Sequence, residues 1–113
     1  MPKKPLLKNL ELYDLSKKLV ISCYALTHDL PESERTNFTR YIRSAALQAH
    51  LSIARKGFGK SKKRKKPLAK ALQALVVIDA AIEILVELGM STAEEVKATT
   101  DLSAACRQLL DQR

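Results

Sequence analysis

The chain has 113 residues, a hydrophobic content of 46% and a formal net charge of +8. This length and apolar content suit one domain with one core, and the absence of a long apolar run or a secretory leader favours a cytoplasmic protein without a membrane span. With only three Gly and four Pro, the chain has little room for linkers or low-complexity sequence, and long helices are expected.

The hydrophobic pattern predicts an all-α fold, an up-down four-helix bundle in a single domain over residues 1–113. The first helix is expected at about 9–28, with Asn9 as its N-cap. Its apolar stripe is Leu12, Leu15, Leu19, Cys23 and Leu26. After a turn at Pro31, the second helix is expected at about 34–56, because Pro and acidic residues suit a first helical turn.

The second and third helices carry more apolar surface than one bundle core can cover. The core stripe of the second is Phe38, Ile42, Ala45, Ala49 and Ile53; that of the third, at about 67–88, is Leu68, Leu72, Leu75, Ile82 and Leu85. Further apolar residues lie off these stripes, and an uncovered apolar face predicts contact with other subunits. The predicted interface residues are Leu47, Leu51, Val76, Val77 and Ile84.

Gly89 should end the third helix, and a capping box at Ser91-Thr92-Ala93-Glu94 should start the fourth, at about 92–111.

Positive charge is concentrated in the connection at 55–66, which follows the second helix and holds eight cations and no acid. Residues 1–66 contain sixteen Lys and Arg against five acids, whereas residues 67–113 contain four against seven. Cations directly before a helix oppose its dipole unless an anion gathers there, so the run indicates a polyanionic partner. The predicted nucleic-acid-binding residues are Arg35, Arg40, Arg43, Arg55, Lys56, Lys60, Lys62, Lys63, Arg64, Lys65 and Lys66. With no Trp and few other aromatics, backbone contact to RNA or DNA should outweigh base stacking. The alternative interpretation of the basic run is a solvated loop that binds no polyanion.

Enzymatic and metal chemistry are not expected. Gly57-Phe58-Gly59-Lys60-Ser61 resembles the end of a phosphate-binding P-loop, but the first Gly of that motif falls at Ala54 and no strand precedes it. Cys23, His28, His50 and Cys106 lack the close ligand pair of a zinc site, and both thiols lie on apolar stripes. We therefore expect no catalytic residue, metal, cofactor or small-molecule substrate.

Several stretches, in order along the chain, resemble one family. Leu10-Glu11-Leu12-Tyr13-Asp14-Leu15 is similar to its first-helix opening, and 30–35 (LPESER) to its F-P-x-x-E-R turn. The segment 40–46 (RYIRSAA) is similar to its Q-I-R-R-A-A stretch, and 53–61 to its I-A-E-G-F-G-R-x-S. The chain thus resembles the four-helix bundle family of 23S rRNA intervening-sequence proteins and of the accessory variability determinants of diversity-generating retroelements.

The departures favour the accessory branch. Gln48-Ala49-His50-Leu51-Ser52 replaces the intervening-sequence pattern S-I-P-S-N, and 65–75 and 82–89 are similar to the accessory third helix. The resemblance implies a barrel-shaped homopentamer that binds RNA, or an RNA/DNA hybrid, and a reverse transcriptase. An intervening-sequence protein of unknown biochemical role, or a structural oligomer that binds no nucleic acid, remains the alternative.

Overall fold

A computed structural model describes the backbone of residues 7–58 and 65–111 and the side chains of 10–55 and 67–111. It contains four α-helices: α1 (Leu7–His28), α2 (Arg40–Phe58), α3 (Lys65–Glu87) and α4 (Ala93–Asp111). Within the described ranges there is no strand. The predicted all-α, four-helix architecture is confirmed.

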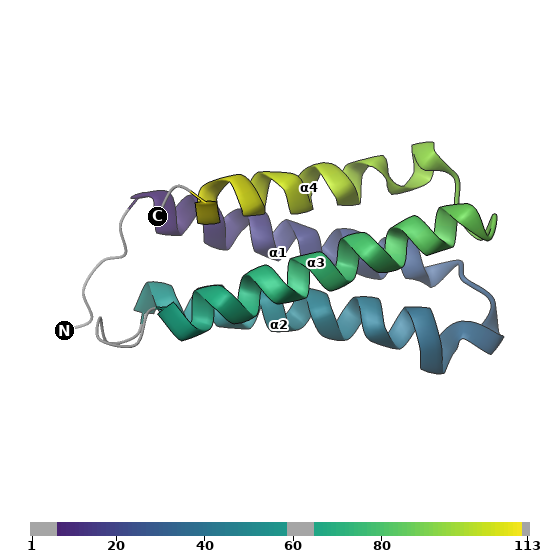
Figure 1. Cartoon of the computed structure of the whole chain (residues 1–113), viewed down its shortest axis with the longest axis horizontal. Helices are drawn as coiled ribbons and strands as arrows, with labels where there is room; N and C mark the ends of the chain where they lie inside the picture. Colours follow the sequence, from purple (N-terminus) through teal and green to yellow (C-terminus); the bar gives the residue numbers. More distant parts are fainter. Residues whose placement is uncertain (1–6, 59–64, 112–113) are drawn as a thin grey trace.

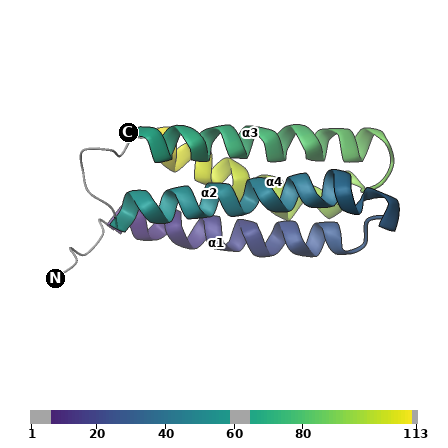
Figure 2. The same ribbon diagram turned by 90° about the horizontal axis from the view of Figure 1, so that it is seen from below.

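The helices alternate in direction along one long axis (Figure 1). α1 packs against α2 and α4, and α3 packs against the same two helices, so α1 and α3 lie at opposite corners of the bundle. Figure 2 shows the same order from a second side. The end of α2 and the start of α3 consequently lie at one end of the bundle, beside the start of α1 (Figure 1).

One cluster of buried side chains, drawn from all four helices, forms the core. The two helices α2 and α3, which pack against each other, both bury small residues: Ala45, Ala46 and Ala49 on α2, and Ala71 and Ala74 on α3. Small side chains allow two helix backbones to approach closely. The core stripe predicted for the second helix is therefore confirmed at four buried positions, Ile42, Ala45, Ala49 and Ile53, with Phe38 half-buried.

The predicted stripe of the third helix was wrong at Leu72, which is 37% exposed. Ile78, which is fully buried, takes its place on the core side. At about 100° per residue, Leu72 lies roughly 120° around the helix from Ile78, outside the buried sector. Leu75, Ile82 and Leu85 are buried as expected.

The helix starts differ from the predicted ones. α1 begins at Leu7, so Asn9 lies inside the first turn. The second helix does not start as an α-helix near Glu34: a 3₁₀ turn (Glu32–Glu34) and a π-helical turn (Arg35–Thr39) precede α2. No side chain caps either turn, which fits a start without regular α-helical hydrogen bonding.

The later boundaries follow the backbone chemistry of glycine, proline and threonine. α2 continues past Gly57 to Phe58. α3 begins two residues before Pro67. The first turn of a helix accepts proline because the N–H groups of that turn have no partner within the helix. Gly89, with φ of 75°, follows the end of α3 as predicted. The capping box is one residue later than predicted: Thr92 N–H donates to Glu95 Oε1 (2.8 Å), and Glu95 N–H donates to Thr92 Oγ1 (3.1 Å).

Candidate nucleic-acid interface

Four of the predicted cations lie at the end of the bundle where α2 stops and α3 starts (Figure 1): Arg55 and Lys56 on α2, and Lys65 and Lys66 on α3. Arg55 is exposed, and one of its guanidinium N–H groups donates to Ser52 Oγ at 3.2 Å. Lys56, Lys65 and Lys66 belong to the two helix ends, although their side chains are not described. Lys60, Lys62, Lys63 and Arg64 lie outside the described residues.

The helices on either side of this connection make its potential strongly positive. α2 contains no acidic residue along its whole length, and the first turn of α3 contains none either. The start of α3 also contributes the positive end of its dipole. An anion placed there would meet free backbone N–H groups as well as side-chain charge.

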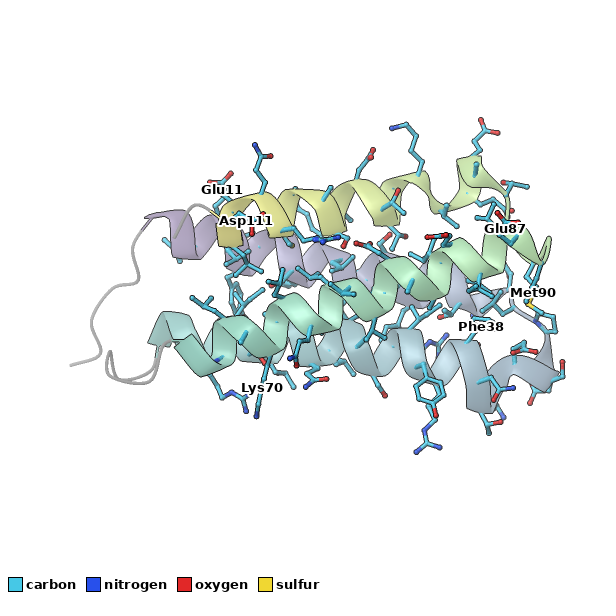
Figure 3. The ribbon with its side chains drawn as sticks, viewed as in Figure 1. Glu11, Phe38, Lys70, Glu87, Met90 and Asp111 are labelled. Atoms are coloured by element: carbon cyan, nitrogen blue, oxygen red, sulfur yellow. The ribbon has the colours of Figure 1, made fainter. Side chains whose placement is uncertain are left out.

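Sequence reasoning missed Lys70, an exposed cation one turn beyond Lys66 on α3. The four-residue spacing could have identified it, because residues i and i+4 share a helix face. Figure 3 shows Lys70 pointing away from the bundle on one side, whereas Glu11 and Asp111 lie on the other side of the same end. Lys70 thus adds positive charge on the α2–α3 side of this end.

Arg35, Arg40 and Arg43 lie near the opposite end of the bundle, and Arg40 is about 22 Å along the helix from Arg55 at 1.5 Å per residue. Arg35 forms an exposed ion pair with Glu32 (3.1 Å), and Arg40 is exposed. The structure therefore does not bring these three cations together with the run at 55–66.

Arg43 connects α2 to α1. Its Nε donates to Thr27 Oγ1 (2.8 Å), and its guanidinium carbon lies 4.5 Å from the centre of the Tyr24 ring. Such a stacked cation contributes about 0.5–1 kcal/mol at an exposed site. Arg43 thus has a structural role that its position in the sequence did not reveal.

Carboxylates cluster at the end where Arg43 lies. Acidic residues occupy both turns there, at Asp29, Glu32, Glu34, Glu94 and Glu95. Glu87 lies at this end as well (Figure 3). The bundle is therefore negative near its two turns and positive where α2 and α3 are joined.

The five predicted interface residues are all on the surface: Leu47, Leu51, Val76, Val77 and Ile84 are between 37% and 55% exposed. Other large apolar side chains, not singled out by the sequence, are exposed with them: Ile21, Tyr24, Tyr41 and Leu88. Where exposed apolar side chains form a patch, they favour contact with another molecule.

A polar cluster between α1 and α2 was also missed. Ser16 Oγ donates to the Tyr13 carbonyl (3.0 Å) and lies 2.8 Å from His50 Nδ1. Because the hydroxyl proton is committed to the carbonyl, Nδ1–H of His50 is the donor to Ser16. The rings of Tyr13 and His50 are 4.7 Å apart. Because Ser16 is fully buried, the cluster is better explained as a structural link between α1 and α2 than as a catalytic site with a serine nucleophile.

Stability should depend on pH through His50. Burial, and secondarily the charge of Lys17, lowers the pKa of His50 below its ordinary value of 6.5. The unfolded chain therefore binds more protons near and below pH 6.5, so the contribution of His50 to the free energy of unfolding is present above that pH and is lost as pH falls through it. Urea unfolding at pH 7.5 and 5.5 measures the difference. His50→Gln should weaken this dependence, and an equally large pH dependence in the variant would contradict it.

The two cysteines are free and buried, as expected. Burial, aided by Asp79, raises the pKa of Cys23 to about 12, and burial raises the pKa of Cys106 to about 11. Ser22 and Thr99 share a hydrogen bond (2.7 Å) between antiparallel α1 and α4. This register places Cys106 about 12 Å along the bundle from Cys23.

In the part of the chain that the structure describes, no three His, Cys, Asp or Glu side chains are grouped so as to hold a metal. None of the helices described is both long and apolar enough to cross a bilayer. No protein-family model matches the chain, and no curated protein matches its sequence.

Proposed function

We propose that this protein is a non-enzymatic, self-associating nucleic-acid-binding protein that assists a reverse transcriptase in a diversity-generating retroelement. The observation that carries the proposal is the charge at the α2–α3 end of the bundle. An acid-free helix leads there into eight cations within twelve residues, and the next helix begins with its dipole positive. RNA, or an RNA/DNA hybrid, supplies a continuous row of phosphates for such a surface.

The contacts should be to phosphates rather than to bases. Phe58 is the only aromatic residue between Arg55 and Lys66, so there is little surface on which bases could stack. Phosphate contacts fix position without reading sequence. Selectivity would then come from the shape of the RNA or from the enzyme partner.

The exposed apolar residues on α2 and α3 support self-association, and the family resemblance implies a ring of five subunits. Repetition of the positive end around a ring would multiply the phosphate contacts that one RNA makes. Val76 and Leu47 are the most useful positions for testing this, because both are exposed and apolar.

Binding of structured RNA should weaken steeply with salt. The logarithm of the affinity is expected to fall linearly with the logarithm of salt concentration, by roughly 0.7–0.9 for each phosphate neutralised. Fluorescence anisotropy over about 50–300 mM salt measures this slope, since screening grows across that range. Affinity that does not change with salt would contradict the proposal and favour a structural oligomer.

Gene neighbourhood distinguishes the retroelement role from that of an intervening-sequence protein. A neighbouring reverse transcriptase gene with template and variable repeats supports the first. An insertion within a ribosomal RNA gene supports the second.

A further inference from the structure

Two opposite faces of the bundle carry apolar residues with charges of opposite sign. We define the basic flank as Lys17, Ile21 and Tyr24 of α1 with Arg43 and Leu47 of α2. We define the acidic flank as Leu72, Val76, Asp79 and Glu83 of α3, beside α4. Because α1 packs on α2 and α3 packs on α4, these flanks lie on opposite sides.

Two contacts between helices fix the basic flank at the junction of α1 and α2. Arg43 lies over the ring of Tyr24, and His50 bonds to Ser16, so both side chains of α2 face α1. Leu47 lies one turn from each of them, on the same side of the helix. It is 37% exposed, and Ile21 across the junction is 62% exposed.

The charge of the basic flank is positive. Lys17 directly follows Ser16, whose Oγ lies 2.8 Å from His50 Nδ1 at that junction, and Lys17 is exposed. Arg43 adds a second cation. Asp14, exposed and three residues before Lys17, is an acid on the same side of α1, and α2 offers none, so two cations accompany one carboxylate.

The acidic flank is fixed by an ion pair. Asp79 of α3 accepts from Arg107 of α4 at 2.8 Å, which places Asp79 at the α3–α4 junction. Val76 and Glu83 lie three residues before and four after it, and thus on the same side. Val76 is exposed. Glu83 is exposed too, and forms no ion pair with any other residue whose side chain is described.

Arg107 neutralises Asp79, so Glu83 provides the free negative charge of this flank. A matching surface would bring an apolar side chain to Val76 and a cation to Glu83. The basic flank has both, in Leu47 and Lys17. A basic flank facing another basic flank would instead bring like charges together, which disfavours a two-fold contact.

We propose that the basic flank of one subunit binds the acidic flank of the next, so that self-association is head-to-tail. The inference rests on the proposed self-association and specifies its geometry. Contacts between unlike faces close into a ring when the rotation between subunits allows it. Between the two flanks lies the α2–α3 face, which carries Leu51, Val77 and Ile84. In a ring built from such contacts, this face would have the same orientation relative to the ring axis in every subunit.

Complementation between two variants tests the pairing. Leu47→Glu damages only the basic flank, and Val76→Glu only the acidic flank. Each variant alone should have the mass of a single chain, 12.6 kDa, by light scattering. Mixed in equal amounts, they should form a species of twice that mass, because each retains the flank that the other needs. The two damaged flanks both carry Glu and repel, so the chain of contacts stops at two.

Controls separate the pairing from the fold and from self-association itself. Ala98→Glu places the same charge on an exposed position of α4 and should keep the wild-type mass. Circular dichroism should show unchanged helix content in every variant. A second test reverses charge: Lys17→Glu and Glu83→Lys should each weaken the assembly at low salt, and the double variant should recover it.

A monomeric wild-type protein would overturn the proposed self-association and the pairing with it. An oligomeric wild type whose two variants remain monomers when mixed would overturn the pairing alone. So would single variants that keep the wild-type mass.

Discussion

Replacement of Lys62, Lys63, Arg64, Lys65 and Lys66 by glutamine is expected to lower the affinity for structured RNA by about two orders of magnitude near 100 mM salt. The substitutions remove five of the eight cations at the α2–α3 end. The salt slope should flatten by roughly 0.7–0.9 for each phosphate that the variant no longer neutralises, and binding to all sequences should fall alike. Anisotropy titrations of both proteins at several salt concentrations measure the affinity and the slope.

Helix content should survive these five substitutions. Glutamine is a good helix former, and removal of cations from the start of α3 relieves unfavourable interactions with its dipole. The control is a double variant, Arg35→Gln with Arg40→Gln. It removes charge at the far end of the bundle and should therefore reduce the affinity for RNA much less. An unchanged affinity after the five substitutions would mean that the run is a solvated loop.

Leu75→Ala should destabilise the fold by about 2–5 kcal/mol, the cost of a large-to-small change that leaves a core cavity. Leu75 is fully buried in the cluster that all four helices share. Urea unfolding at a fixed protein concentration measures the change, since self-association makes stability concentration-dependent.

Leu72→Ala is the matched control, because it makes the same chemical change one turn earlier on α3. Leu72 is on the surface of the single chain but belongs to the acidic flank, so the pair is compared in the Leu47→Glu background, where no neighbour is expected to cover it and its truncation should cost about 1 kcal/mol or less. Equal destabilisation at the two positions would show that Leu72 is covered, either by the core or by another subunit.

Helical periodicity was sufficient to predict the number of helices and most of the core. Ile42, Ala45, Ala49 and Ile53 are buried because an apolar spacing of three and four residues generates one face. The buried sector was less predictable on α3, where apolar residues surround the helix. Leu72 and Ile78 were both suitable there, and only the positions of α2 and α4 decide between them.

Local chemistry set the helix ends to within about two residues, except at the start of α2, which begins at Arg40 rather than near Glu34. Ser91 and Thr92 are both good N-caps, and Glu94 and Glu95 both follow at three-residue spacing. The hydrogen bonds select Thr92 and Glu95. The π-helical turn before α2 was not predicted, although it contains Thr36, Asn37 and Thr39, which have low helix propensity.

The candidate site was predictable in composition but not in arrangement. A charge run is visible in any sequence, whereas the positions of Arg43 beside Tyr24 and of His50 beside Ser16 depend on the register between α1 and α2. Residues sixteen or more positions apart meet there only because two helices pack. No local pattern encodes such contacts.

The separation of charge along the bundle affects how fast a nucleic acid is found. With carboxylates at the turn end and cations at the α2–α3 end, the molecule would experience a torque near a polyanion, and would turn its positive end forward before contact. Subunits that point the same way in a ring would add their torques. Because the field decays over about 8 Å at physiological ionic strength, this orientation would act only in the last step of the approach, and dilution of salt would lengthen its reach.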